Sequence, residues 1–241
     1  MKVGKDAPGI RNIMQRFFDI VFSLIGLILT SPIFLVMAIV IAIDSPGGVF
    51  YKGERIGKDG KPFKMYKFRS MVPNAAQIGA VNVMDNDNRV TRVGHFLRKS
   101  KIDELPQFIN VLKGDMSFVG PRPEVQCFVD MYTEEEEVIL TMRPGITDWA
   151  SMANFKQYEI LGELGDKINP DDVYVKLIRP LKLKLQLYHV EHNSLGSYFK
   201  IIFWTVYKVI SRSEKLPKEI EPMVEQYAKE ILVVKEELLK A

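Results

Sequence analysis

Two adjacent carboxylates, Asp103 and Glu104, lie in a stretch whose residue types and spacing could support chemistry. Asp and Glu are also common at the first turn of a helix, where free N–H groups and the helix dipole favour negative charge. Pro106 is tolerated in a first turn and predicts a helix that begins near Asp103. On this spacing alone, capping is the simpler interpretation of the pair.

Basic residues around the pair favour a catalytic role over helix capping. The same stretch contains several cations: Arg89, Arg92, Arg98, Lys99 and Lys101. Further along the chain Pro121 and Pro123 flank Arg122, and would hold its guanidinium in a fixed direction that suits bidentate binding of phosphate. Carboxylates are ligands for Mg²⁺, arginines neutralise a transferring phosphoryl group, and a carboxylate can itself attack phosphorus. The set therefore indicates metal-assisted phosphoryl transfer.

These residues follow a long apolar segment. Residues 20–43 contain no ionisable side chain, and a helix of that length, at about 1.5 Å per residue, spans a bilayer core of about 30 Å. The segment is too long for a cleaved signal peptide. Basic residues flank it on both sides, which the positive-inside rule places in the cytoplasm. A re-entrant helix bent at Ser31-Pro32 satisfies both flanks, whereas an ordinary anchor with a tolerated proline kink is the alternative.

Composition limits the remaining classes. The chain has 241 residues, of which 47% are hydrophobic and 26% charged, with one cysteine and a net charge of +3. This excludes a mostly disordered chain, a disulfide scaffold and a multi-cysteine zinc site. The modest net charge and the lack of a recognised module argue against nucleic-acid binding.

The elements that must position the carboxylates are mostly short. We expect a hairpin with its turn at residues 58–61, since β-prone segments flank a Lys-Asp-Gly-Lys sequence. Apolar residues at helical spacing, or good helix formers, predict further helices over residues 92–99, 104–113, 124–140, 171–192, 198–211 and 217–241. The segment 198–211 is apolar and aromatic, and is expected either in the membrane interface or in a core. The predicted fold is mainly α with short β pieces.

Five motifs in sequence order give a specific resemblance. They are Tyr66-Lys67-Phe68-Arg69-Ser70-Met71, Arg89-Val90-Thr91-Arg92-Val93-Gly94, Asp103-Glu104-Leu105-Pro106-Gln107, residues 112–124 and Arg143-Pro144-Gly145-Ile146-Thr147. Together they resemble the bacterial sugar transferase family, the monotopic phosphoglycosyl transferases. The break at Ser31-Pro32 is similar to the family's re-entrant membrane helix, and favours that topology here.

The resemblance implies a reaction and its participants. Such enzymes move a phosphosugar from a UDP-sugar to a polyprenol phosphate in a ping-pong reaction and release UMP. Asp103 would be the nucleophile and bind Mg²⁺, and Glu104 would assist it. Four arginines would bind substrate: Arg98, Arg122, Arg69 and Arg89. A bacterial inner-membrane location follows, with the catalytic domain on the cytoplasmic face and with downstream glycosyltransferases or a second copy of the chain as further partners.

One segment departs from the family pattern. After Thr147 many family members have Gly and then a Gln-Val-Asn-Gly-Arg-Asn-like stretch, whereas here residues 148–156 differ, the expected arginine is absent, and Lys156 could stand in for it. We expect four regions: a basic flank (1–16), the re-entrant helix (17–43), the catalytic domain (44–212) and a C-terminal amphipathic helix (213–241). A non-catalytic membrane scaffold, or a protein that binds anionic lipid, is the alternative, but it predicts a damaged carboxylate pair.

Overall fold

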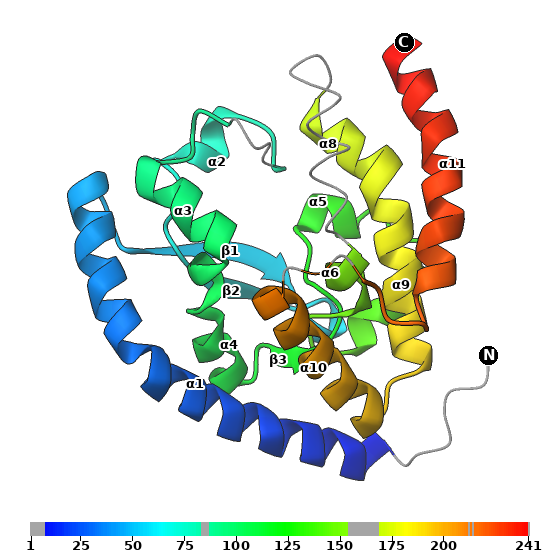
Figure 1. Cartoon of the computed structure of the whole chain (residues 1–241), viewed down its shortest axis with the longest axis horizontal. Helices are drawn as coiled ribbons and strands as arrows, with labels where there is room; N and C mark the ends of the chain where they lie inside the picture. The colour runs from blue at the N-terminus through cyan, green and yellow to red at the C-terminus, as the bar shows by residue number, and fades with distance from the viewer. Residues whose placement is uncertain (1–7, 83–86, 154–168, 212, 214, 241) are drawn as a thin grey trace. The chain divides into compact units, whose positions relative to one another are not determined.

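The computed structural model describes residues 8–82, 87–153, 169–211, 213 and 215–240, and its elements are mainly helical. The long helix α1 (Pro8–Asp44) leads into a hairpin of β1 (Phe50–Ile56) and β2 (Pro62–Phe68), joined by the turn η1 (Lys58–Gly60) (Figure 1). The expected hairpin is confirmed. Its strands are antiparallel, with Gly53 opposite Met65, and Asp59 and Gly60 adopt the positive φ of a tight turn.

The chain divides into two compact units. Of the described residues, one unit contains 8–79 and 87–146, and the other contains 80–82 and those from 147 onward. The first unit holds α1, the hairpin and the remaining short elements of this half: α2 (Ala75–Ile78), α3 (Arg92–Ser100), η2 (Ile102–Glu104), α4 (Gln107–Lys113), β3 (Ser117–Val119), α5 (Gln126–Val129) and η3 (Glu136–Thr141). The second unit begins inside β4 (Gly145–Thr147), which pairs with β3.

The second unit is helical in all its other described elements. They are α6 (Trp149–Ala153), α8 (Pro170–Val173), the π-helical turn η6 (Tyr174–Ile178), α9 (Arg179–Glu191), α10 (Leu195–Ser211) and α11 (Glu221–Lys240). Val173, Leu177 and Ile231 form a core cluster that joins α11 to α8 and η6. The helices expected over 171–192, 198–211 and 217–241 are therefore confirmed, with boundaries shifted by a few residues.

One expected helix is wrong. The segment 124–140 contains only the single turn α5 and the 3₁₀ helix η3, with turns between them. Thr133 and Glu136 bond reciprocally, since the amide of Thr133 donates to Glu136 Oε2 (2.9 Å) and the amide of Glu136 donates to Thr133 Oγ1 (3.3 Å). This capping box starts a new helix in the middle of the segment, so one continuous helix cannot form.

Helix α1 is continuous through Pro32 and bends, so that its two arms run in different directions (Figure 1). Pro32 has no N–H to bond the carbonyl of Ile28, and Ser31 Oγ donates to that oxygen at 2.8 Å. Thr30 Oγ1 donates to Gly26 O at 2.6 Å. The Ser31 hydroxyl thus compensates the carbonyl that loses its partner to the proline, as a lipid environment requires, and the Thr30 hydroxyl is itself satisfied by Gly26 O.

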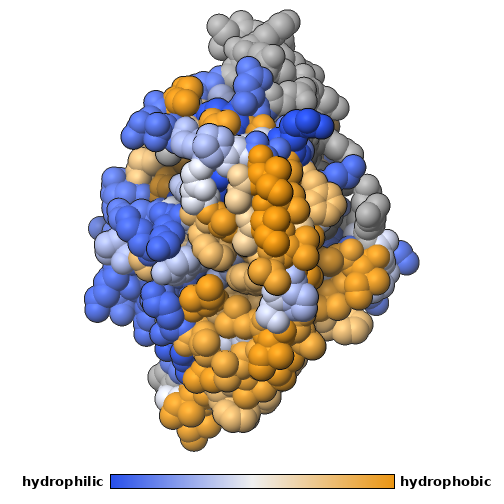
Figure 2. All heavy atoms as spheres, turned by 90° about the vertical axis from the view of Figure 1, so that its left-hand side faces the viewer, coloured by the Kyte–Doolittle hydropathy of each residue, from blue (hydrophilic) through white to orange (hydrophobic). Residues whose placement is uncertain are grey.

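The outer face of α1 is apolar. In the most apolar 18-residue stretch of α1 only 6% of the residues are buried. The length and composition of the helix suit a membrane segment. Exposed large side chains run along it, among them Ile13, Phe17, Ile28, Leu29 and Ile43. Figure 2 shows the apolar side chains gathered over this helix. A face of this extent needs an apolar environment, which supports membrane association of the chain.

Candidate active site

The carboxylate pair lies in a single turn between two helices. Asp103 and Glu104 form the 3₁₀ turn η2, which follows α3 after Lys101. Lys101 has φ of 61°, the left-handed conformation that ends a helix, and its amide bonds Arg98 O. Pro106 is the N-cap of α4, which begins at Gln107, so the helix starts later than the expected position near Asp103. The predicted helix over 104–113 is therefore a turn plus α4, and the helix over 92–99 is confirmed as α3.

Glu104 is held by two cations. Its Oε1 accepts hydrogen bonds from Lys67 Nζ (2.8 Å) and from Arg122 Nη2, and its Oε2 accepts from Arg122 Nη1 (3.2 Å). Burial opposes ionisation of this carboxyl, but Arg122 and Lys67 outweigh burial and hold the pKa of Glu104 well below its usual range. Glu104 is therefore a fixed anion with both oxygens engaged.

Asp103 has the opposite environment. Its side chain is buried, with the residue 7% exposed, and Oδ1 has no hydrogen-bond partner among the described residues. Burial raises the pKa of Asp103, and the charge of Lys67 opposes that shift while Glu104 adds to it. Two neighbouring carboxyl groups with pKa values pushed apart are typical of a division of roles in catalysis.

Lys67 is a site residue that the motif analysis did not single out. It lies on β2 and reaches Glu104, while Asn110 of α4 ties the same strand to the helix after the pair. Asn110 Oδ1 accepts from the amide of Tyr66 (2.8 Å), and Nδ2 donates to Lys64 O (2.8 Å). The strand that carries Lys67 and the helix that follows Glu104 are thus locked together. The signal in the sequence is the lysine inside the Tyr-Lys-Phe-Arg motif.

Arg98 and Arg122 lie at the carboxylate pair. Arg98 is close enough to Asp103 to lower its pKa, and the described part of the chain gives its guanidinium no hydrogen bond or ion pair. Arg122 binds Glu104 and also donates to Ile146 O (3.2 Å). The segment 120–123 forms a loop, as expected. Arg98 and Arg122 can contribute positive charge to an anion bound at Asp103.

Arg69 has a different setting. It is buried, and its guanidinium donates to the carbonyls of Ser45 and Pro46, directly after α1. Gly47 beside it has φ of +119°, and a Cβ there would lie 2.9 Å from Arg69 Nη1. The described contacts of Arg69 are therefore structural, and its predicted role in binding substrate stays a prediction.

Arg89 is also engaged. It forms a two-pronged ion pair with Asp87, with Nη2 to Oδ2 at 2.6 Å and Nε to Oδ1 at 2.9 Å. Its Nη1 donates to Ala75 O at 2.9 Å. These bonds fold the loop before α3, so binding of substrate by Arg89 would require an exchange of partners and likewise stays a prediction.

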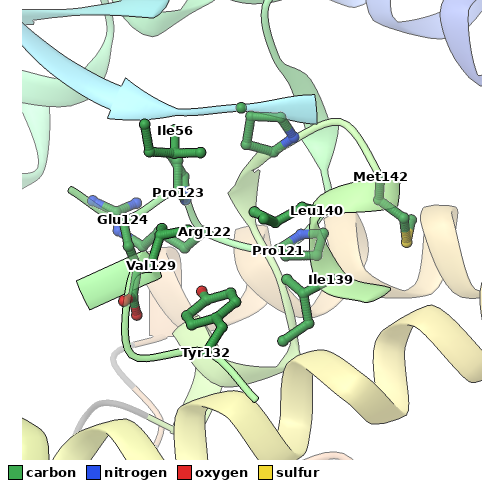
Figure 3. A pocket seen from close by; sticks show the side chains of 12 residues that line it. Ile56, Pro121, Arg122, Pro123, Glu124, Val129, Tyr132, Ile139, Leu140 and Met142 are labelled. Carbon is green, nitrogen blue, oxygen red and sulfur yellow. The ribbon is translucent and has the colours of Figure 1, made fainter. Parts of the chain in front are cut away.

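A small cavity lies against the loop that carries Arg122 (Figure 3). It is lined by Ile56, by the loop 121–124 and by apolar side chains, among them Tyr132, Ile139 and Met142. Its volume of about 20 Å³ has room for about one water molecule, so it is not a pocket for a nucleotide.

The departure after Thr147 has a local explanation. Asp148 is fully buried and caps α6, with Oδ1 accepting from the amide (2.6 Å) and the hydroxyl (2.7 Å) of Ser151. Its Oδ2 accepts from Gln186 Nε2 at 3.0 Å. The acid thus anchors the start of α6 on α9. Lys156, the proposed stand-in for the family arginine, lies outside the described residues.

Comparison with known proteins identifies the family. The model for bacterial sugar transferases matches residues 10–212, and the chain belongs to this family. Similar curated proteins include the UDP-N-acetylgalactosamine-undecaprenyl-phosphate N-acetylgalactosaminephosphotransferase of Aeromonas hydrophila, 39% identical over 201 residues, which are 82% of this chain and 44% of that protein. The UDP-glucose:undecaprenyl-phosphate glucose-1-phosphate transferase of Escherichia coli K12 is 36% identical over 208 residues, 84% of this chain and 42% of that protein.

A shorter relative matches over nearly its whole length. The exopolysaccharide production protein PSS of Rhizobium leguminosarum is 36% identical over 213 residues, 84% of this chain and 98% of that protein. The chain thus spans less than half of the two longer transferases and almost all of this one. The family model, which matches residues 10–212, includes all but the first two residues of α1 and all the residues of the site described above.

Proposed function

We propose that this chain is a membrane phosphoglycosyl transferase that moves a phosphosugar from a UDP-sugar to undecaprenyl phosphate and releases UMP. The names of the similar curated proteins support the two substrates. The observation that carries the proposal is the pair itself: a buried Asp103 with an unpartnered oxygen, beside a Glu104 fixed by two cations.

The proposed reaction has two displacements at one phosphorus. In the first, a carboxylate oxygen of Asp103 bonds to the phosphorus that carries the sugar, and the bond from that phosphorus to the bridging oxygen breaks. The electron pair leaves with UMP, and the product is an aspartyl phosphosugar. In the second, an oxygen of undecaprenyl phosphate bonds to the same phosphorus and the Asp103 oxygen leaves, which restores the free carboxylate.

Glu104 would support this chemistry without reacting. Because both of its oxygens are engaged and its pKa is low, it is a poor nucleophile and base, and serves to hold Lys67 and Arg122 beside Asp103. Arg98 and Arg122 would bind the phosphates of the donor. Charges fixed in a buried site stabilise a transferring phosphoryl group more than they would in water.

The residues also fit Mg²⁺. No group of three or more His, Cys, Asp or Glu side chains that could hold a metal occurs among the described residues. Mg²⁺ needs no such cage, since it commonly binds one or two carboxylates plus substrate phosphates. The unpartnered oxygen of Asp103 is the protein ligand we propose. The bound ion would neutralise charge on the phosphates.

The membrane arrangement is part of the proposal. The bend at Pro32 and the compensated carbonyl support a re-entrant α1 with both ends on the cytoplasmic face of the inner membrane. Helix α10 is two-sided: Tyr198 and Ile201 are fully buried, whereas Phe203 and Ile210 are 67% and 78% exposed. Its exposed face would lie in the membrane interface, where the lipid phosphate is found.

Release of UMP tests the function. Purified protein in nanodiscs is incubated with Mg²⁺ and a panel of UDP-sugars, with and without undecaprenyl phosphate. We expect sustained UMP release with at least one sugar, only when the lipid is present. A folded sample that releases no UMP from any of the sugars would contradict the proposal and favour the scaffold alternative.

A further inference from the structure

Helix α1 carries a buried polar stripe that a plain membrane anchor does not need. Arg16, Asp19, Ser23 and Gly26 are spaced by three and four residues, and so share one face of the helix. Asp19 and Ser23 are fully buried, although the helix around them is mostly apolar and its outer face is exposed. A buried carboxylate is costly unless it is hydrogen-bonded, so its partners indicate what the stripe does.

The stripe holds α4 and the strand that follows it. Arg16 donates through Nη1 to Val111 O and through Nη2 to Leu112 O (2.7 Å), which are carbonyls of the last turn of α4. Carbonyls at the end of a helix lack the usual partner four residues on, and although Val111 O also accepts from the amide of Gly114 (3.1 Å), Arg16 adds a bond to it and one to Leu112 O. Asp19 Oδ1 accepts from Ser117 Oγ and from the amide of Phe118, each at 3.0 Å, at the start of β3.

Glycines allow this close approach. A Cβ on Gly26 would lie 2.8 Å from the ring of Phe108, so α4 packs directly on the backbone of α1 at that point. Gly114, just after α4, has φ of +93°, the left-handed conformation that glycine adopts without strain, and it ends α4 where Arg16 bonds the carbonyl of Leu112. The N-terminal arm of α1 thus fixes α4 by hydrogen bonds at one end and by packing at Phe108.

The C-terminal arm of α1 holds α3 instead. Asp44 Oδ2 accepts from the amide of Val93 (3.2 Å), in the first turn of α3. Ile41 packs with Phe68 and Leu97 in one buried cluster. The two helices that flank the turn with Asp103 and Glu104 are therefore each held by a different arm of α1.

We infer that α1 positions the carboxylate pair, with Arg16 and Asp19 as positioning residues that fix α4 relative to α3. The inference rests on the proposed function. The two arms meet at the bend near Pro32, so the geometry of the membrane helix is transmitted to the turn that carries Asp103. Displacements of about 1 Å at a reacting group can cost about 100-fold in rate.

The test compares three substitutions in nanodiscs. Asp19→Leu removes the acceptor for Ser117 and Phe118, Asp19→Asn keeps an oxygen there, and Arg16→Gln removes the guanidinium from α4. Hydrogen exchange of peptides covering residues 102–113 is measured together with kcat and KM for the UDP-sugar. Lys61→Gln, which removes one positive charge from the exposed end of the hairpin, is the matched control.

We expect Asp19→Leu and Arg16→Gln to speed exchange over 102–113 and to lower kcat about 10- to 100-fold, with KM little changed. Asp19→Asn should restore most of both properties, and Lys61→Gln should behave as wild type. Wild-type exchange and kcat in Asp19→Leu and Arg16→Gln would overturn the inference. So would faster exchange spread equally over the β1–β2 hairpin, because that pattern means general destabilisation.

The two proposals fail in different ways. Exchange does not depend on turnover, so it reports on the hold of α1 on α4 even in a sample without activity. A wild-type protein that releases no UMP would contradict the proposed function. An active wild type whose α1 variants show normal exchange and kcat would contradict only the positioning role.

Discussion

Lys67 and Arg122 converge on one carboxylate, and this convergence separates the roles of Asp103 and Glu104. Sequence reasoning found the pair and Arg122 because each lies in a contiguous motif. It did not single out Lys67, because that lysine is one of many in a basic segment and only the packing of β2 against η2 and α4 brings it to Glu104. Arg69 and Arg89 look the same in sequence, yet their described partners are Ser45, Pro46, Asp87 and Ala75.

Removal of Lys67 tests its role at the residue scale. Lys67→Met leaves Glu104 with Arg122 alone and takes one cation from Asp103, so kcat/KM should fall at least about 10-fold. Lys64→Met is the matched control: Lys64 is on the same strand, and its exposed ion pair with Glu54 contributes little. Equal activity of both variants, measured as UMP release, would show that Lys67 is not part of the site.

His189 predicts a pH dependence of stability. Burial lowers its pKa to about 4, against 6.5 for an exposed histidine, although the charge of Asp148 opposes the shift. Above pH 6.5 neither the folded nor the unfolded state binds the proton, and the free energy of unfolding is unaffected. Between pH 6.5 and 4 the unfolded state binds a proton that the folded state excludes, so stability falls as the pH drops. The loss is about 3 kcal/mol at most.

The measurement is thermal unfolding in detergent at pH 7 and pH 5. His189→Leu should flatten the decline between these values, since neither ring nitrogen of His189 has a hydrogen-bond partner among the described residues. His192→Leu is the control, because His192 is exposed and stacks on Tyr188. An unchanged decline in His189→Leu would refute the assignment.

At the scale of elements, local signals predicted the hairpin, α3 and the helices after residue 169 well. The failure at residues 124–140 arose because helical composition outweighed a capping signal, Thr133-x-x-Glu136, that was present in the sequence. Contacts across the chain were not predictable in this way. The bonds from Arg16 and Asp19 to residues about 100 positions away depend on tertiary packing, which no local pattern encodes.

Gly145 tests how the loop with Arg122 is held. A Cβ on Gly145 would lie 2.1 Å from the backbone nitrogen of Gly120, so the two segments touch through their main chains. Gly145→Ala must push the loop 120–123 away and move Arg122 from Glu104, and we expect loss of most activity and a lower melting temperature. Gly9→Ala, where a Cβ meets nothing within 4 Å, should change neither. Normal activity in Gly145→Ala would contradict this account of the loop.

At the scale of the whole molecule, the bend of α1 predicts that both of its ends face the cytoplasm. In a Cys127→Ser background, Gly9→Cys and Lys52→Cys are labelled with an impermeant maleimide in inside-out vesicles. Both should react, and Ser31→Ala combined with Pro32→Ala should straighten the helix and protect Gly9→Cys. Reaction of only one of the two sites in the chain with native Ser31 and Pro32 would mean that α1 crosses the membrane.

The most direct test of the central claim is the mass of the protein after exposure to the donor alone. Wild-type protein in nanodiscs is incubated with Mg²⁺ and the active UDP-sugar without undecaprenyl phosphate, and then analysed intact and after proteolysis. The account predicts release of UMP equal to the amount of enzyme, and a phosphosugar on the peptide that contains Asp103. Asp103→Asn should show neither. A wild-type protein that transfers sugar to the lipid but never carries it on Asp103 would contradict the account.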